Sequence, residues 1–372
     1  MNLKKRIKVL AAVFALLLAA SCSGVGDSPS GEPTGEQTGG QAGEQTGTQG
    51  GGTLNLFTWE GMFPQEFMNS FEKDTGIKIN YVNFDSDETM LTKLEAAGGG
   101  DYDLIFADDY IIETVIAKGL AQKWDQSKLT NRANINPLYQ GQFYDPTDEY
   151  TVPHGAGIQT IVYNPATSPI AITCYADLWD ASLKDSVGII GHHRVINGMA
   201  LKVLGKSYNT DDLGDINAAG EKLIELAPNI RLIKDDSIQN DFLAGEISAA
   251  VMYTSQVTQV MLEDSSFEVV FPTEGIGFGI IAAFVPSNAP NAGAAHAFIN
   301  YLLDAERSAR CFEWLGYYCT NKAADPLIEP EFRPFLTLPE NFGGGMEMIQ
   351  NISAEAEEVH MDVWTKFKQQ TE

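Results

Sequence analysis

The sequence is poor in basic residues. Only 24 lysines and arginines stand against 50 aspartates and glutamates, and the formal net charge at pH 7 is −26. Nucleic-acid binding needs a basic surface that neutralises phosphates, so this charge argues against nucleic acid as a partner. A negative field favours the approach of cations, but acidity also keeps an exported protein soluble, and charge alone does not separate these two interpretations.

Cysteine is also scarce. The chain has 4 cysteines, at positions 22, 174, 311 and 319, and none of them forms a C-x-x-C pair. A zinc site of that type is therefore not indicated. In an exported protein Cys311 and Cys319 could form a disulfide if the geometry allows it.

The common catalytic motifs are missing. The sequence contains no G-x-S-x-G elbow, no H-E-x-x-H helix, no P-loop and no EF-hand loop. The glycine-spaced run 275–279 precedes a predicted strand, which is the wrong order for a dinucleotide-binding loop. His192 and His193 are adjacent, but neither has a second ligand at metal spacing. We therefore expect neither an enzyme nor a bound cofactor or metal.

The first 52 residues predict export and a flexible connection. Residues 1–21 combine a basic start with an apolar run, 9–20, that is too short to cross a bilayer comfortably, which is typical of a secretory signal. The sequence LAASC resembles a bacterial lipoprotein signal, which implies that Cys22 is lipidated; ordinary cleavage near Cys22 is the alternative. Residues 23–52 contain no aromatic side chain and cannot bury enough apolar surface to fold, so we interpret 22–52 as a tether.

The body begins with an alternation of strands and helices. Apolar runs at 54–59, 78–82 and 104–107 predict strands, and helix-period segments separate them. This β-α-β-α-β order predicts an α/β fold with a mainly parallel sheet covered by helices. Ligands bind beyond the carboxyl ends of such strands, and Trp59 and the run 108–110 follow two of those ends.

A second alternating region follows the first. We expect a strand at 160–163 to cross into it, and we expect helices at 176–185, 292–311 and, as a pair, 346–368. The natural architecture is two β/α lobes joined by crossing strands, with a ligand cleft at the hinge. We assign 53–158 with about 279–335 to lobe 1, and 159–278 with about 336–372 to lobe 2.

Several segments resemble the spermidine/putrescine-binding components of bacterial ABC importers: TLNLFTWEGMFPQEFMNSFEKDTGIKINY, SDETMLTKLEA, DYDLIFADDY, YADLWD, AGEISAAVMY and VHMDVWTKFK. The resemblance covers residues 53–368. It implies a type II periplasmic-binding-protein fold, no enzymatic activity, and delivery of a small cationic solute to permease subunits. With the lipoprotein signal, it implies a monomer anchored on the outer face of the bacterial cell membrane, in the periplasm or outside the cell.

The resemblance also implies where ligand contacts lie. The residues carried over are Trp59, Tyr110, Tyr253 and Gln350, with His192 at a position where the family has an acid. Val195 and Ile281 stand at two further acidic positions of the family. Asp108 and Asp235 stand where small hydroxyl residues are common, and we expect these two carboxylates to restore the charge that an ammonium needs.

Other interpretations stay open at this level. The aromatic residues could be core packing, and Asp108 and Asp235 could be helix caps or turn residues. The ligand could be another small polar solute, or ferric iron held by Tyr317 and Tyr318 with a histidine. A surface lipoprotein that keeps the fold but acts as an adhesin or sensor is a further alternative.

Overall fold

The first strands of the body alternate with helices, as the sequence predicts, in a computed structural model that describes residues 52–234, 237–338 and 345–371. The strands are β1 (Gly52–Thr58), β2 (Ile77–Asn83), β3 (Leu104–Asp108), β4 (Ala121–Gln122), β5 (Thr151–Tyr163), β6 (Val187–Ile189), β7 (Ile230–Ile233), β8 (Ala249–Tyr253), β9 (Glu268–Val270), β10 (Ile276–Pro286), β11 (Tyr318–Cys319) and β12 (Met346–Met348). The α-helices are α2 (Gln65–Thr75), α3 (Asp87–Ala96), α4 (Asp109–Ala117), α5 (His193–Val203), α6 (Leu213–Leu226), α7 (Ile238–Leu243), α8 (Thr254–Glu263), α9 (Ala292–Leu302), α10 (Ala305–Leu315), α11 (Arg333–Leu336) and α12 (Ala354–Thr371).

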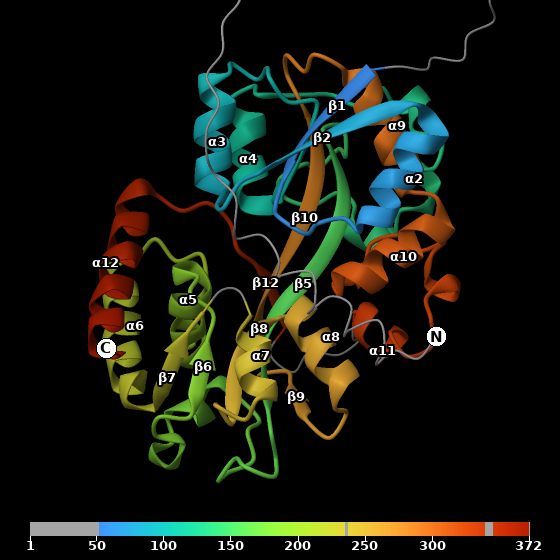
Figure 1. The fold of residues 1–372 in the computed structure, drawn as a ribbon. Coiled ribbons are helices and arrows are strands. Elements are labelled where there is room, and N and C mark those ends of the chain that lie inside the picture. Colours follow the sequence, from blue (N-terminus) through green and yellow to red (C-terminus); the bar gives the residue numbers. More distant parts are fainter. Residues whose placement is uncertain (1–51, 235–236, 339–344, 372) are drawn as a thin grey trace, which may run out of the picture. The chain divides into compact units, whose positions relative to one another are not determined.

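The sheet has parallel strands at both ends and antiparallel strands in its middle. Its main order is β2-β1-β3-β10-β5-β8-β6-β7 (Figure 1). β1 pairs in parallel with β2 and β3, and β6 pairs in parallel with β7 and β8. The predicted parallel sheet of the first unit is therefore confirmed. β10 runs antiparallel to both β3 and β5, which joins the two parallel ends.

The crossing strand is longer than the sequence predicts. β5 has 13 residues, begins at Thr151 rather than at 160, and is buried along its whole length. Its first part pairs with β10 and its last part pairs with β8 and β9. Pro153 lies inside it, opposite a register shift in β10 between Ile281 and Ala282. Such an irregularity accommodates a residue that lacks an N–H donor.

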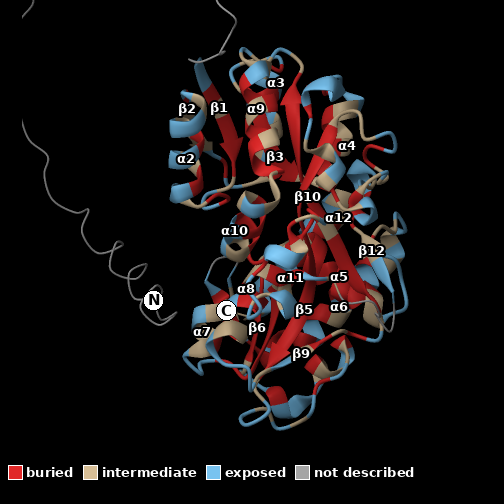
Figure 2. Cartoon of the chain, turned by 90° about the vertical axis from the view of Figure 1, so that its right-hand side faces the viewer, coloured by how far each residue is buried: buried red, intermediate tan, exposed pale blue. Residues whose placement is uncertain are grey.

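Opposite faces of the first strands pack on different helices. Leu54 and Leu56 of β1 belong to a cluster with Phe71 of α2 and Phe298 of α9. Phe57, which follows Leu56 and points to the opposite face, belongs to a second cluster that includes side chains of α3 and α4. This alternation follows from the two-residue period of a strand. Buried residues accordingly concentrate in the strands and on the inner faces of the helices (Figure 2).

The C-terminal helix α12 covers the other end of the sheet. It packs against α5 and α6, which lie beside it in Figure 1. The approach to α6 is close, because a Cβ on Gly220 would lie 2.7 Å from Val363. The described residues, from 52 onward, cluster as one compact unit. The lobe boundaries given above stay a prediction.

Three predicted helices are wrong in detail. The segment 176–185 forms two short 3₁₀ turns, because Asp180 has an extended backbone and caps the second turn. The segment 292–311 divides into α9 and α10, because Asp304 caps α10 by accepting a hydrogen bond from the Arg307 backbone N–H at 3.2 Å. The predicted pair at 346–368 is one strand, β12, paired with β10, followed by one helix.

The three cysteines of the body are free thiols. Cys311 and Cys319 are buried and Cys174 is half-buried, and none of the three pairs with another. Burial raises the pKa of both buried thiols. The possible Cys311–Cys319 disulfide is therefore absent from the structure.

Candidate functional site

Two helix N-termini bring acidic side chains together. β3 ends at Asp108, where α4 begins with Asp109, and α3 begins at Asp87. Ser86 fixes the start of α3, because its hydroxyl accepts a hydrogen bond from the Thr89 backbone N–H at 3.2 Å. The backbone N–H of Asp108 donates to Oδ1 of Asp87 at 3.4 Å, which joins the two helix starts. Helix N-termini carry partial positive charge and so favour carboxylates at these positions.

These carboxylates are buried or half-buried and are not neutralised by a basic side chain. Asp87 and Asp109 are each 2% exposed, and Asp108 is half-buried. Among the residues that the structure describes, no lysine or arginine forms an ion pair with any of the three. Asp109 instead accepts hydrogen bonds from the Tyr110 and Ile280 backbone N–H groups at 2.8 and 2.9 Å.

The pKa values of the cluster reflect this burial. Burial, then the charges of Asp108 and Glu88, raise the pKa of Asp87 well above its usual range. Burial raises the pKa of Asp108 to about 6, although its hydrogen bond with Asp87 lowers it. Burial and then the charge of Asp108 raise the pKa of Asp109. Asp87 and Asp108 therefore share a proton, and a bound cation would favour its release.

Tyrosine side chains lie beside the acidic cluster. The hydroxyl of Tyr110 donates to Oε1 of Glu88 at 3.1 Å. Tyr317 lies over β5, where a Cβ on Gly157 would be 2.7 Å from its ring, so this position requires glycine. Burial raises the pKa of Tyr317 to about 12, and the charge of Asp108 adds to the increase. Aromatic faces next to carboxylates suit an alkylammonium group.

A different set of groups lies at the N-terminus of α5. His192 is the N-cap residue, and its ring stacks on His193 with the centroids 5.4 Å apart. Glu357 of α12 contacts His193 and accepts a hydrogen bond from Nη1 of Arg194 at 3.2 Å. Nη2 of Arg194 donates to the Gln350 carbonyl at 3.2 Å. Burial lowers the pKa of His192 to about 4, so its imidazole is neutral at pH 7.

Six of the seven predicted ligand-binding side chains lie in the described part of the chain. Asp108 and Tyr110 lie in the acidic cluster, and His192 and Gln350 lie at the N-terminus of α5. Asp235, like Cys22, lies outside the described residues.

The two other aromatic residues are placed by their strands. Trp59 follows β1 and packs edge-on against Phe84 with the ring centroids 4.4 Å apart. Tyr253 ends β8 opposite Gln159 of β5. A ligand role for both rings stays a prediction.

Two residues of the site, Asp87 and Arg194, escape the sequence reasoning. Asp87 shares the proton of Asp108, and Arg194 contacts Gln350. Asp109 is predicted at the strand end and anchors β10, and Tyr317 is predicted only as an iron ligand and lies next to Asp108. Asp87 directly follows a recognisable helix cap, Ser86, so a helix-terminus search could find its position but not its contact with β3. Nothing in the local sequence indicates the burial of Arg194.

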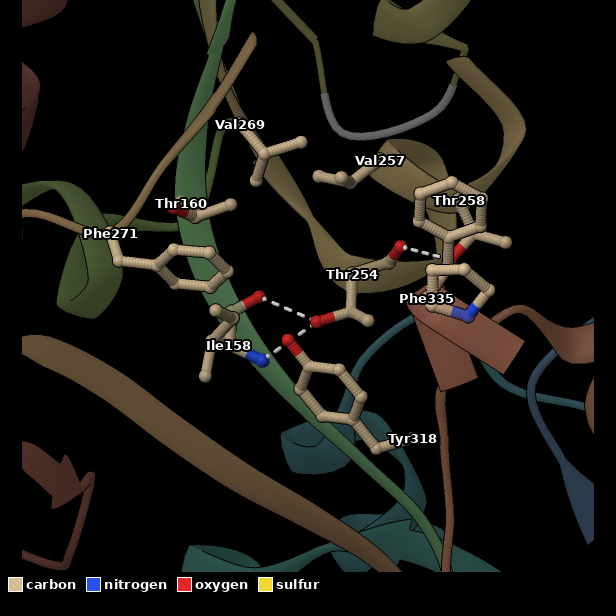
Figure 3. Close-up of a pocket in the computed structure, with 10 residues that line it drawn as sticks. Ile158, Thr160, Thr254, Val257, Thr258, Val269, Phe271, Tyr318 and Phe335 are labelled. Atoms are coloured by element: carbon tan, nitrogen blue, oxygen red, sulfur yellow. Dashed lines mark hydrogen bonds between the residues drawn. The ribbon is translucent and has the colours of Figure 1, made fainter. Parts of the chain in front are cut away.

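The adjacent tyrosines of the iron hypothesis do not share a site. Tyr317 lies over Gly157, whereas Tyr318 lines a cavity of about 150 Å³ together with Ile158. Successive residues of β5 point to opposite faces, which separates the two rings. The cavity is mostly apolar, and Thr254 in its wall bonds both backbone groups of Ile158 (Figure 3). In the described ranges no three His, Cys, Asp or Glu residues form a group that could hold a metal.

Comparison with known proteins identifies the family. The model of the bacterial extracellular solute-binding proteins matches residues 66–333. The chain belongs to this family. A spermidine/putrescine-binding periplasmic protein of Salmonella typhimurium is 35% identical over 75% of this chain and 80% of its own length. A putrescine-binding periplasmic protein of Escherichia coli is 28% identical over 85% of this chain and 91% of its own length.

A solved structure supports the same relationship. The spermidine/putrescine ABC transporter substrate-binding protein of Streptococcus pneumoniae superposes with a TM-score of 0.76 at 26% identity. The match covers 87% of this chain and 100% of that chain. The type II periplasmic-binding fold expected from the sequence is thereby confirmed. The relatives of this solute-binding protein are transport proteins rather than enzymes.

Proposed function

We propose that this solute-binding protein captures a polyamine such as putrescine or spermidine and delivers it, chemically unchanged, to ABC permease subunits. The observation that carries the proposal is a group of three carboxylates, the buried Asp87 and Asp109 and the half-buried Asp108, without a basic partner among the described residues. Relatives whose names state polyamine binding support the choice of ligand.

The physical reason is the cost of removing an ammonium from water. A buried ammonium needs a carboxylate and further acceptors, since an isolated buried charge is far more costly than stacking on a ring can offset. A cation over an aromatic face contributes about 0.5 to 2 kcal/mol, so aromatic residues alone are insufficient. Asp108 and its neighbours supply the charge, and Tyr110 and Tyr317 lie close enough to add such contacts.

Capture follows from hinge motion about the shared strands. β5 and β10 pair with each other and with strands at both ends of the sheet. A ligand held first by the acidic cluster would favour a closed form through contacts with the α5 end. Only contacts that exist in the closed form shift this equilibrium. The closed form is the one that we expect a permease to recognise.

A thermal-shift screen tests the proposed ligand class. Putrescine, cadaverine, spermidine and spermine at about 100 times Kd are expected to stabilise the protein by about 2.7 kcal/mol, because they bind only the native state. Amino acids and ferric or divalent metal ions serve as the comparison set. If no polyamine raises Tm while an amino acid or a metal does, the polyamine assignment is wrong.

We also propose that the protein is a lipid-anchored monomer outside the cytoplasmic membrane, held by Cys22 and the tether 22–52. The LAASC sequence supports this, and no described helix combines the length and apolarity that a membrane crossing requires. In cell fractionation, Cys22→Ala is expected to move the protein from the membrane to the soluble fraction. Ser23→Ala is the matched control and should stay with the membrane. Retention of the Cys22→Ala chain on the membrane would rule out this anchor.

A further inference from the structure

The loop that follows β1 brings Trp59 to the edge of the sheet where the acidic cluster lies. β1 and β3 are neighbouring parallel strands, and Trp59 follows the first while Asp108 ends the second. The half-buried ring of Trp59 packs edge-on against Phe84, with the ring centroids 4.4 Å apart. Phe84 lies three residues before Asp87 in the chain. The conformation of the loop 59–62 therefore decides where this ring lies relative to the carboxylates.

Tyr81 of β2 holds both ends of the loop. Its hydroxyl donates a hydrogen bond to the Trp59 carbonyl at 2.6 Å and accepts one from the Met62 backbone N–H at 3.3 Å. Burial raises the pKa of Tyr81 to about 12, so the hydroxyl keeps its proton at neutral pH. One oxygen atom thus fixes the first and the last residue of the loop.

Trp314 holds the middle of the loop from a distant part of the chain. Gly61 has a φ of 74°, a left-handed conformation that glycine adopts without strain, and its carbonyl accepts a hydrogen bond from Nε1 of Trp314 at 2.9 Å. Trp314 lies near the end of α10 and is 43% exposed. Because almost half of the side chain stays in water, its burial contributes only part of the usual stabilisation. Loss of the indole N–H should therefore affect the loop more than the fold.

The end of α10 also reaches the acidic cluster. Gly316 ends the helix with a φ of 76°, and Tyr317 follows it over β5, next to Asp108. Thr258 of α8 fixes this turn, because its hydroxyl donates to the Gly316 carbonyl at 2.8 Å. The segment 314–317 therefore contacts the loop 59–62 at one end and lies beside Asp108 at the other.

An anchored segment of this kind spares the solute an entropic cost. A side chain that is ordered only when the ligand binds loses rotamer freedom at that moment, and this loss lowers the affinity. A ring that its surroundings already hold in the productive position avoids the loss. Within the described ranges, the loop 59–62 receives such support from two elements, β2 through Tyr81 and α10 through Trp314.

We propose that Trp314 is a positioning residue of the solute site, whose indole N–H holds the loop 59–62 on α10 and thereby keeps the ring of Trp59 in place beside the acidic cluster. Trp314 acts through Trp59 and does not itself need to touch the solute. This inference rests on the proposed function, because it assigns Trp59 to the binding of a polyamine.

Calorimetric titration of the full chain with putrescine at pH 7.5 gives the first readout. Trp314→Phe keeps a ring but removes the N–H donor, and it is expected to weaken binding about fivefold, the net effect of one hydrogen bond. Trp179→Phe is the matched control, because Nε1 of Trp179 donates to the Lys222 carbonyl of α6 at 2.8 Å. This control loses an equivalent bond elsewhere and should keep its affinity. Unchanged affinity in Trp314→Phe, or an equal loss in Trp179→Phe, overturns the inference.

A double-substitution cycle shows whether Trp314 acts through Trp59. In a Trp59→Ala background, adding Trp314→Phe should change the affinity less than twofold, because the ring that it positions is gone. A full fivefold loss in that background would mean that Trp314 acts independently, which overturns the inference. Unchanged affinity in Trp59→Ala alone also overturns it, since Trp59 would then not hold the solute.

Fluorine NMR of the ligand-free chain labelled with 5-fluorotryptophan gives a readout that does not depend on affinity. The chain has 5 tryptophans, and substitution of each by phenylalanine assigns its signal. The Trp59 signal should shift or broaden in Trp314→Phe and stay unchanged in Trp179→Phe. A Trp59 signal that does not move in Trp314→Phe overturns the positioning role. The proposed function stands in all these cases if putrescine or spermidine binds the unsubstituted chain, and it fails together with the inference if no polyamine does.

Discussion

Replacing Asp108 with asparagine is expected to weaken putrescine and spermidine binding about 100-fold at pH 7.5. Asp108 lies at the start of α4 and shares a proton with Asp87 in the buried cluster. Truncating one partner of a buried charge pair costs about 2 to 5 kcal/mol. The lower part of this range applies, because Asp87 and Asp109 remain. Isothermal titration calorimetry measures the change directly.

The same substitution is expected to stabilise the ligand-free protein. The folded-state pKa of Asp108 is raised to about 6 by burial, above the ordinary value of 3.8. Between pH 3.8 and about pH 6 the folded state keeps a proton that the unfolded state releases. The free energy of unfolding therefore falls as the pH rises through this range, and it stays at the lower value above pH 6. Asparagine removes this penalty. The gain at pH 7.5 should be on the order of 1 kcal/mol, allowing for the partial exposure of Asp108, and should vanish near pH 3.5.

Opposite effects on binding and stability distinguish a ligand carboxylate from a structural cap. Denaturant unfolding at the two pH values gives the stability, and Asp101→Asn is the matched control. Asp101 is exposed with a φ of 65°, a conformation that asparagine adopts readily, so binding and stability should both stay unchanged. If Asp108→Asn lowers stability and leaves the affinity intact, Asp108 is a capping residue and does not hold the ligand.

Polyamine affinity is expected to fall about tenfold as the pH drops from 6 to 5. The ammonium groups stay protonated over this range, so the change comes from the protein. A cation can bind only after the proton shared by Asp87 and Asp108 has left. Below the Asp108 pKa of about 6, each drop of one pH unit makes the deprotonated pair about tenfold rarer, and the affinity falls by the same factor. Above pH 7 the affinity should level off. Titrations between pH 5 and 8 give the profile.

Two controls separate this effect from acid unfolding. Burial lowers the pKa of His154 to about 3, so protonation of the unfolded chain destabilises the fold below pH 6.5. The Tm of the ligand-free protein must therefore be recorded at each pH. In Asp108→Asn the slope of affinity against pH should flatten, because the shared proton is gone. A flat profile for the unsubstituted protein between pH 7.5 and 5 would contradict a proton-sharing pair at the ligand site.

The local elements of the fold could be predicted where their pattern is strong. β1 to β3 lie within two residues of the predicted runs, because apolar periodicity reports the faces that pack. The failures lie where a cap or a distant pairing overrides propensity. Asp304 stops one helix and starts the next, and Met346 joins a strand because β10 lies beside it.

The candidate site could be predicted only in part. Asp108 and Tyr110 follow a strand end in an α/β pattern, which is enough to nominate them. Asp87 is 21 residues from Asp108 in the chain, and its contact with Asp108 exists only because α3 and α4 cover the same face of the sheet. The position of Asp108 opposite Ile281 likewise depends on the β3–β10 register.

The sequence by itself determined the alternation of strands and helices, the strongly acidic character and the family, because periodicity, composition and motifs are local properties of a chain. Only the tertiary structure decided which carboxylates are buried side by side and which thiols stay free. Those properties depend on burial and on distances between residues far apart in sequence, and both arise only when the sheet assembles and the helices pack on it.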